Sequence, residues 1–435
     1  MVDFRELHQL TASELIKYSD ESSSLLASYL RACQNRTVSR EELVQAWAAL
    51  EEPLTGDTSL RGALRGIPIG VKDIYDTRSL PTTWGTDYIR VENSVSDAAL
   101  VSLLKHAGGL IMGKTVSTEF AYFTPGKTRN PHDIARTPGG SSSGSAAAVA
   151  DGMVPISIGT QTAGSITRPA SFCGVIGFKP TFGILPTAGI KQFSQSLDTP
   201  GYFARSISDI ALVHSVLTGG GGHNGVSYES ACAKIAICRI PRDGPLDNEM
   251  SKALDRTRER LRDLGHVVEE LQLPSDFDEL VHLQSSIMAY EAGRSLAAEF
   301  CEYAADMGPK LVEIIEKGLA ISSEEYLNAR VKAKGLVHEL DARLQEIDLI
   351  ISPSAIGQAP AGHETTGDPL YSRAWTLAGL PTVSLPVEKS DAGMPLGMQL
   401  IGRRYGDLQL MCWADQIIRQ LVDSTGTIPI ARATD

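Results

Sequence analysis

The residues best suited to chemistry lie within residues 137–180, where two clusters of glycine and serine are separated by a short helical segment and an apolar one. The first cluster, residues 139–144, reads GGSSSG, and the second, residues 159–165, reads GTQTAGS. Small side chains let successive backbone N–H groups converge on one point, where they can bind an oxyanion. An isolated cluster of this kind is usually only a turn. Two clusters joined by a helix and a strand favour a site for acyl transfer.

The second cluster ends in Ser165, whose hydroxyl directly follows a run of small residues. The amides of Thr162, Ala163, Gly164 and Ser165 are candidate donors of an oxyanion hole, and Ser165 Oγ is the candidate nucleophile. A serine hydroxyl needs a neighbouring base before it becomes a good nucleophile. That base must come from elsewhere in the chain.

Lys72 is a candidate for that base because it follows an apolar run, residues 67–71, that is expected to be a buried strand. Burial disfavours the charged ammonium and lowers the pKa of a lysine, and a neutral lysine can act as a general base. The simpler alternative is a solvated lysine at a strand end, as most lysines are. Both interpretations fit the residues alone.

Together these motifs resemble the amidase signature family. That family carries a Gly-Gly-Ser-Ser-Gly-Gly-type loop, a second serine 24 positions after the first serine of the loop, and a lysine far upstream. Here those residues are Ser141, Ser165 and Lys72, the last within the segment LRGIPIGVKD at residues 64–73. The similarity runs from about residue 66 to residue 209 and returns at about residues 347–401.

The resemblance implies a hydrolase that cleaves linear amides to an acid and ammonia, without a cofactor or a metal. It implies that Ser165 is the nucleophile, that Ser141 follows a cis peptide bond and relays protons, and that Lys72 is the base. The reaction would pass through an acyl-enzyme. Family members are often homodimers, and the implied fold is a single domain around one large mixed sheet.

Two positions depart from the common family pattern. Most members have Asp and Arg where this chain has Gln161 and Thr167, and here the arginine comes one residue later, at Arg168. Malonamidase-like members share this arrangement, in which the arginine holds the substrate's carboxylate, and a planar guanidinium suits that task. The resemblance therefore implies that Arg168, Gln161 and Ala121 bind a small carboxylated amide such as malonamate. The alternative for Arg168 is a structural salt bridge to one of the 52 acidic residues.

Other functions fit parts of the sequence. Among hydrolases, the alternatives are an amidase for neutral or aryl amides and the amidase subunit of a glutamine-dependent tRNA amidotransferase, which needs partner chains. Residues 108–115, GGLIMGKT, match the P-loop of NTP-binding proteins, but the expected strand fills the variable positions. Residues 140–144 match G-x-S-x-G without a strand before them, and residues 220–225 match G-x-G-x-x-G after a helix rather than a strand.

Composition limits the partners and the location. The 435 residues carry a net charge of −12, which disfavours nucleic acid or an anionic membrane as the main partner. The six cysteines are scattered without a Cys-x-x-Cys pair, which predicts neither a zinc site nor a disulfide framework. We recognise no signal peptide and no apolar run of membrane-spanning length. We therefore expect a cytoplasmic protein whose partner is a small-molecule substrate.

Strands alternate with helices along the chain, which predicts an α/β fold with helices on both faces of a sheet, and the family resemblance implies that this sheet is large and mixed. No shift in composition marks a linker, so we treat residues 1–435 as one domain. Its expected parts are N-terminal helices at 1–60, a signature core at 66–210, a mostly helical pocket-shaping region at 240–345 and a C-terminal return to the core at 346–435.

Capping residues predict where several helices start. Thr11 and Ser39 each precede a glutamate by three positions, as in a capping box, and residues 1 to about 54 are expected to be helical. Ser96 is expected to cap a helix at residues 97–106. Trp375 could face the pocket or be an ordinary core aromatic, and we favour the core.

Overall fold

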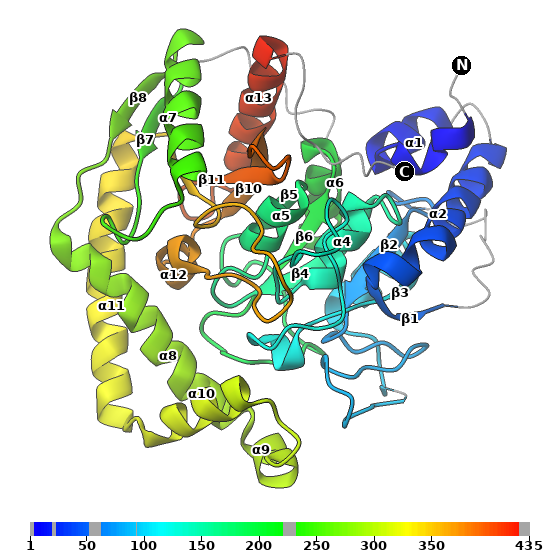
Figure 1. Ribbon diagram of the computed structural model, residues 1–435, viewed down its shortest axis with the longest axis horizontal. Helices are drawn as coiled ribbons and strands as arrows, with labels where there is room; N and C mark the ends of the chain where they lie inside the picture. The colour runs from blue at the N-terminus through cyan, green and yellow to red at the C-terminus, as the bar shows by residue number, and fades with distance from the viewer. Residues whose placement is uncertain (1–3, 20–22, 52–61, 93, 221–231, 426–435) are drawn as a thin grey trace.

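The computed structural model describes residues 4–19, 23–51, 62–92, 94–220 and 232–425. One 11-stranded mixed sheet runs through it, with helices on both faces (Figure 1), which confirms the predicted fold class. The strand order is β1-β3-β2-β4-β6-β5-β10-β11-β9-β7-β8. The strands are β1 (Trp47–Leu50), β2 (Pro68–Lys72), β3 (Leu110–Thr115), β4 (Ile156–Gln161), β5 (Ile176–Lys179), β6 (Thr199–Ala204), β7 (Lys234–Ile237), β8 (Val267–Glu270), β9 (Leu349–Pro353), β10 (Thr382–Lys389) and β11 (Pro395–Ile401).

Two parallel groups of strands are joined by antiparallel ones. β2 pairs in parallel with β3 and β4, and β7 pairs in parallel with β8 and β9. The other pairs are antiparallel. Because parallel neighbours end at the same edge of a sheet, the carboxyl ends of β2 and β4 meet. Lys72 ends β2 and Gln161 ends β4, so the two segments that carry the predicted chemistry leave the sheet side by side.

The helices form a layer on each face of the sheet and a separate arm (Figure 1). On one face α3, α6, α13 and α7 follow one another, while α4 and α5 pack together on the other. The helices are α1 (Ala12–Ser19), α2 (Ser23–Val44), α3 (Ala99–His106), α4 (Ser143–Ala150), α5 (Thr167–Cys173), α6 (Ile207–Thr218), α7 (Asn248–Asp263), α8 (Glu279–Ser295), α9 (Ala297–Tyr303), α10 (Pro309–Ala320), α11 (Ser323–Arg343), α12 (Leu370–Leu377) and α13 (Asp407–Thr425). Short 3-10 helices are η1 (Phe4–Gln9), η2 (Glu119–Ala121), η3 (Ser275–Asp278) and η4 (Leu344–Glu346).

Helix α4 lies deep in the fold, since all eight of its residues are buried. Gly144 makes this packing feasible, because a Cβ there would lie 2.2 Å from the Ala46 carbonyl oxygen and 2.4 Å from the Val116 amide nitrogen. Such approaches are closer than any real side chain tolerates, so the first turn of α4 requires glycine. The tight packing fixes the segment that includes Ser141 and Ser142 directly before the helix.

The arm consists of α8 to α11 and covers the later part of the region expected at residues 240–345, whose earlier part, α7 and β8, belongs to the sheet layer. Helix α8 packs against α10, α11 and α12 and so connects the arm to the sheet layer.

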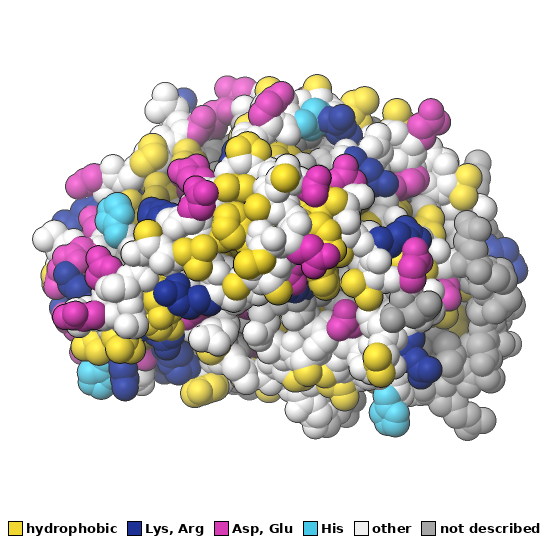
Figure 2. Space-filling model, turned by 90° about the horizontal axis from the view of Figure 1, so that it is seen from below, with side chains coloured by type: hydrophobic (Ala, Val, Ile, Leu, Met, Phe, Trp, Pro, Cys, Tyr) yellow, Lys and Arg dark blue, Asp and Glu magenta, His cyan; other side chains and the backbone are white. Residues whose placement is uncertain are grey.

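Seen from below, acidic and basic side chains are interspersed around a central group of apolar ones (Figure 2). Trp375 of α12 is fully buried among apolar residues, as expected of a core aromatic. In the described part of the chain, no helix is both long and apolar enough to cross a membrane.

The expectation of a helix through about residue 54 is wrong. Helix α2 ends at Val44, Gln45 adopts a positive φ of 53°, and Trp47–Leu50 form strand β1, which pairs antiparallel with β3. Leu43 shares helical spacing with Trp47, but Leu43 is 44% exposed whereas Trp47 is buried against Gly113. Docking of the indole onto a glycine of the sheet edge therefore overrides the local helical pattern.

One of the two capping boxes is present. Thr11 N donates to Glu14 Oε2 at 2.9 Å and Glu14 N donates to Thr11 Oγ1 at 3.2 Å, as predicted. The Ser39 box is wrong, because Ser39 lies inside α2 and its hydroxyl donates to the Arg36 carbonyl instead. A sequence motif for capping cannot reveal that the preceding residues are already helical.

The helix expected at residues 97–106 begins at Ala99 rather than at Asp97. The carboxylate of Asp97 accepts from the Arg78 amide at 2.8 Å and pairs with Lys105 at 2.8 Å. Asp97 is thus held by a loop and by the helix it precedes, and Ser96 does not cap α3.

Candidate active site

A small chamber lies where the segment that follows β3 and the loop after β4 meet the segment before α4. Its polar walls bring together Ser141, Ser165, Thr162 and Arg168, with Ala121 and Ala163 beside them. Its apolar walls are Tyr122, Phe123, Phe193 and Met288. Residues far apart in the sequence therefore share one enclosed space, and the two predicted serines share it.

Lys72 stands behind this chamber and is completely buried. Its Nζ donates to Ser141 Oγ at 2.7 Å and to Thr160 Oγ1 at 3.0 Å. Burial lowers the pKa of Lys72 to about 7, while the charge of Asp198 acts in the opposite direction. A substantial fraction of this lysine is therefore neutral near pH 7 and able to accept a proton from a hydroxyl.

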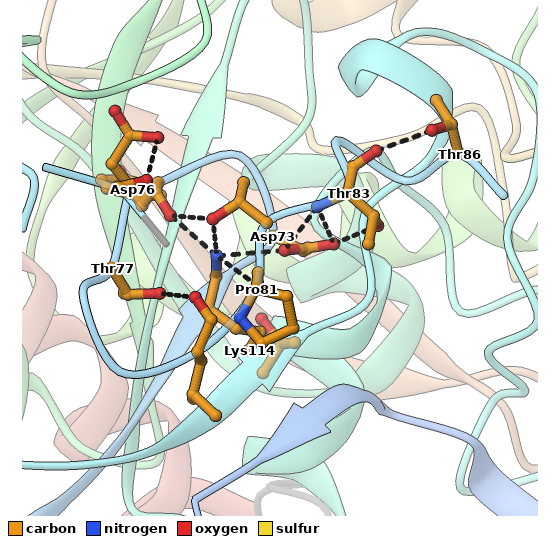
Figure 3. Close-up of polar contacts among 12 residues, drawn as sticks. Asp73, Asp76, Thr77, Pro81, Thr83, Thr86 and Lys114 are labelled. Atoms are coloured by element: carbon orange, nitrogen blue, oxygen red, sulfur yellow. Dashed lines mark hydrogen bonds and ion pairs between the residues drawn. The ribbon is translucent and has the colours of Figure 1, made fainter. Parts of the chain in front are cut away.

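The loop after Lys72 is held by a second buried lysine (Figure 3). Lys114 Nζ lies 3.0 Å from Asp73 Oδ1 and donates to the Tyr75 carbonyl at 2.8 Å and to Thr82 Oγ1 at 2.6 Å. Asp73 also accepts from the amide and hydroxyl of Thr83. This network fixes the chain directly beyond Lys72.

Ser141 is 3% exposed and follows a cis peptide bond from Gly140, as the family resemblance implied. Its carbonyl accepts from the Thr118 amide at 3.2 Å, and the carbonyl of Gly140 accepts from Arg168 Nη2 at 2.6 Å. The backbone on both sides of the peptide bond is therefore held, on one side by the Thr118 amide and on the other by Arg168 of α5. This arrangement keeps Ser141 Oγ between Lys72 and the chamber.

The loop at residues 162–165 presents its amides because its other polar groups are already engaged. The Thr162 carbonyl accepts from Gln284 Nε2 at 2.9 Å, and the Ala163 carbonyl accepts from Thr376 Oγ1 at 2.7 Å. Within the described residues, the amides of Ala163, Gly164 and Ser165 have no protein acceptor. Unsatisfied amides beside a serine hydroxyl are what an oxyanion requires.

Gln161 does not line the chamber, unlike the other two predicted binding residues, Arg168 and Ala121. Its Oε1 accepts from the amides of Ile166 at 2.8 Å and Thr167 at 3.0 Å, and its Nε2 donates to Thr376 Oγ1 at 3.0 Å. The side chain thus satisfies the first amides of α5. It positions Ser165 and Arg168 at the start of that helix rather than offering a free group to a ligand.

Arg168 is 2% exposed, and no ion pair to it occurs among the described residues. Nε donates to the Thr366 carbonyl at 2.7 Å, and Nη2 donates to Gly140 and to Thr366 Oγ1. Nη1 has no partner, although the guanidinium lines the chamber. Burial lowers the pKa of Arg168 to about 9, and Asp368 opposes this effect. The structural salt bridge that was the alternative for Arg168 is therefore absent among the described residues. Nη1 of the buried guanidinium is left able to donate a hydrogen bond to a ligand.

The apolar wall is built by a backbone turn with two left-handed residues. Phe120 and Ala121 have φ of 45° and 59° in succession, a conformation that side-chain-bearing residues rarely adopt. This turn directs Tyr122 and Phe123 to the boundary between the chamber and an outer cavity of about 400 Å³, which both residues also line. Arg168 lies 5.7 Å and Arg373 lies 6.0 Å from the Phe123 ring centre. The guanidinium groups of Arg168 and Arg373 thus both lie near this boundary between the chamber and the outer cavity.

Sequence reasoning missed several residues of this site, among them Phe123, Phe193, Arg373 and Asp198. Asp198 accepts a hydrogen bond of 2.5 Å from the Thr162 hydroxyl. One signal could have found it, since Asp198 is the only charged residue between Lys191 and Arg205. The aromatic and arginine residues carry no comparable signal, because they reach the chamber only through the tertiary fold.

The other sequence motifs stand apart from this site. Residues 110–115 form strand β3, so the P-loop-like segment has its backbone in the sheet and its Lys114 paired with Asp73. The G-x-G-x-x-G match lies mostly in residues 221–231, outside the described residues. No cluster of three or more metal-ligating side chains occurs among the residues described.

Comparisons with known proteins agree with this geometry. The Amidase family model matches residues 25–411. The chain is 31% identical over 474 aligned positions to a glutamyl-tRNA(Gln) amidotransferase subunit from Anaeromyxobacter dehalogenans, covering 95% of this chain and 93% of that one. A solved amidase structure matches with a TM-score of 0.85 at 27% identity, covering 94% of this chain and 100% of the other. The peptide amidase of Stenotrophomonas maltophilia matches with a TM-score of 0.81 at 25% identity over the whole of both chains.

Proposed function

The chain belongs to the amidase family and is an amide C–N hydrolase, and from this premise we propose that its substrate is a small amide that carries a carboxylate. We assign Ser165 as the nucleophile, Ser141 as the proton relay and Lys72 as the base. The contact of 2.7 Å between Lys72 Nζ and Ser141 Oγ supports the relay. The unpartnered Nη1 of Arg168 carries the assignment of the substrate.

In the proposed first half-reaction, Ser165 Oγ bonds to the amide carbon. Its proton passes to Ser141 Oγ as the proton of Ser141 passes to neutral Lys72, and the amides of the 162–165 loop bind the oxyanion. Collapse of this intermediate breaks the C–N bond, and the relay returns the proton to the leaving nitrogen, which departs as ammonia.

In the second half-reaction, water attacks the acyl-enzyme. One proton of the water passes through Ser141 to Lys72, and collapse returns it to Ser165 Oγ as the acid leaves. Lys72 must be neutral at the start of each half-reaction, and its burial among hydroxyls supports this requirement.

Arg168 sets the class of substrate in this proposal. A buried guanidinium with an open N–H is unfavourable until an anion pairs with it. Because Arg168 and Ser165 share the walls of a small chamber, a carboxylate bound at Arg168 would lie only a short distance from the amide under attack. Malonamate is a substrate of this kind, because its carboxylate and its amide are separated by a single methylene group.

The test compares ammonia release from malonamate with release from butyramide, a neutral amide of similar size. We expect malonamate to be preferred and Ser165→Ala to release none from either. Arg168→Lys keeps the positive charge without the planar fork, and Arg168→Gln removes the charge. Both should lower kcat/KM for malonamate far more than for butyramide, whereas an equal loss on both amides would reduce Arg168 to a structural role.

The amidotransferase relative supports a second candidate, in which the amide is glutamine and the ammonia is passed to partner chains. Gln161 and Thr167 depart from the usual Asp and Arg of that class. Ammonia release from glutamine, with no release from malonamate, would favour this second candidate. Ser165→Ala is again the blank.

A further inference from the structure

We propose that Asp198 is a positioning residue of the reaction, whose carboxylate joins the oxyanion loop to the opposite chamber wall and presents a negative charge to Lys72. This inference rests on the proposed function, because it gives Asp198 a task in the same serine–lysine machinery. Asp198 itself is not a chamber residue and contacts no reacting atom.

The hydrogen bonds of Asp198 span two walls. Oδ1 accepts from the Thr162 hydroxyl at 2.5 Å, and Thr162 begins the oxyanion loop. Oδ2 accepts from the amides of Phe193 at 2.7 Å and Ser194 at 3.0 Å, and Phe193 forms the apolar wall. Thr162 and Phe193 both line the chamber, so one carboxylate holds two segments of the chamber wall relative to one another.

The surroundings of Asp198 are unusual for a buried acid. It is 8% exposed, and no Lys or Arg lies within ion-pair distance of it among the described residues. A buried carboxylate without a cation is costly, so this one is held by neutral donors. Its principal opposite charge is Lys72, which is not in contact with it.

Other titratable groups face Asp198 from the elements around it. Tyr75, on the loop after β2, has a pKa raised by burial and further by the charge of Asp198. Glu291 of α8 accepts from the Ser194 hydroxyl and the Ser196 amide, on the far side of the same loop. Among these groups, Lys72 is the one whose charged form is stabilised by the negative charge of Asp198.

The electrostatic consequence concerns the strength of the base. Burial raises the pKa of Asp198 to about 6 and lowers that of Lys72 to about 7, so the two groups titrate in the same pH range and the charge of each favours the charge of the other. The charge of Asp198 raises the pKa of Lys72, against the effect of burial. Without that charge Lys72 becomes neutral at lower pH, but it also becomes a weaker base.

Asparagine separates the charge from the geometry. In Asp198→Asn, Oδ1 can accept from the two amides, and Nδ2 can donate to Thr162 Oγ1, whose lone pairs are available. The shape is kept and the charge is lost. Asp198→Ala loses both, and the oxyanion loop then has no tie to the Phe193 wall.

Asp407 provides a matched control. It is also a buried aspartate, and it accepts from the Thr181 hydroxyl at 2.5 Å and from the Thr181 amide at 2.7 Å. It begins α13 and is not in the walls of the chamber. Asp407→Asn therefore repeats the chemical change outside the reaction machinery.

The experiment measures the rate at which phenylmethylsulfonyl fluoride inactivates Ser165 as a function of pH, with labelling mapped by mass spectrometry. This probe needs no knowledge of the substrate, and its reaction requires a deprotonated serine. For Asp198→Asn we expect the acidic limb of the profile to move to lower pH with a reduced plateau. For Asp198→Ala we expect a plateau lower by about 10²-fold, similar to the loss of an oxyanion-hole donor. Asp407→Asn should follow the wild-type profile.

The outcomes distinguish this inference from the proposed function. A wild-type enzyme that is not labelled at Ser165 would remove the serine mechanism and this inference with it. Labelling at Ser165 with an Asp198→Asn profile that superimposes on the wild type, or that moves to higher pH, would leave the mechanism and overturn the role of Asp198. A normal thermal melt for Asp198→Asn excludes unfolding as the cause of a shift.

Discussion

Two lysines lie on adjacent strands of the same sheet and have opposite surroundings. Lys72 pairs with Thr115 across β2 and β3, and Lys114 pairs with Val71, one position away. Both are completely buried. Lys114 has a carboxylate at 3.0 Å, whereas the hydrogen bonds of Lys72 within the described part of the chain go to two hydroxyls. The difference supports a loop-holding role for Lys114 and agrees with the role in proton transfer that we propose for Lys72.

Burial lowers the pKa of both lysines, but the charge that opposes burial differs. For Lys114 the first cause is desolvation, which contact with Asp73 opposes. For Lys72 the opposing charge is the more remote Asp198, and its pKa falls to about 7. A carboxylate in contact with a buried lysine stabilises the charged ammonium, as Asp73 does for Lys114. Without such a contact, as at Lys72, the neutral amine that a general base requires is more accessible.

A third lysine shows that a low pKa is not sufficient. Burial also lowers the pKa of Lys179 to about 7, with Asp407 opposing. Its Nζ donates to the Pro180 carbonyl at 2.9 Å, and it has no place in the chamber. Lys72 differs because its partner is a hydroxyl that reaches the nucleophile's chamber. In the proposed mechanism, position rather than acidity therefore distinguishes Lys72 from Lys179.

The largest effect should come from Lys72→Met. We expect kcat/KM for amide hydrolysis to fall by about 10²–10⁴-fold, the usual contribution of a general base, while the fold remains. Lys179→Met is the matched control, since it removes an equally buried amine of similar pKa. Equal losses of activity in the two variants would contradict the assignment of Lys72.

The next effect tests the other member of the pair. Lys114→Met leaves Asp73 charged and buried, so we expect the free energy of unfolding to fall by about 3–5 kcal/mol. Denaturant unfolding measures this loss. The double variant Asp73→Asn/Lys114→Met should recover part of it, because no unpaired charge then remains. A fully stable Lys114→Met protein would show that the ion pair does not hold the loop.

The smallest effect is a pH dependence that sharpens the comparison. Because Lys72 acts as a base only when neutral, kcat/KM should fall as the pH drops through about 7. In the Lys114→Met protein that remains folded, the pH at the midpoint of this fall in kcat/KM should be unchanged, since Lys114 contacts neither serine. Rates between about pH 5 and pH 9 bracket that pKa and provide the measurement. A profile that is flat below pH 7 would argue against Lys72.

Much of this site could be predicted because its residues cluster in short segments. Ser141 and Ser165 lie in glycine-rich loops around one helix and one strand, and Lys72 follows an apolar run. The parallel pairing of β2 with β4 then brings them to one edge. Local pattern and strand order explain why these segments meet, while the roles of Ser141 and Lys72 were implied by the family resemblance.

The rest depends on contacts between distant segments. Phe123 and Arg373 are 250 positions apart and meet only in the folded chain. Gln161 has the residue type of a ligand-binding side chain, yet the amides of α5 occupy its oxygen. Strand β1 has the local periodicity of a helix, and only the packing of Trp47 on Gly113 makes it a strand. Sequence patterns indicate residue types, and the fold decides which atoms are already in use.

The most direct test of the serine–lysine account is to trap the acyl-enzyme during amide turnover and to map it by mass spectrometry. We predict an acyl group on Ser165 in the wild type, and none on the same time scale in Lys72→Met or Ser141→Ala. An acyl group on a different residue, or turnover by Ser165→Ala at the wild-type rate, would contradict the account.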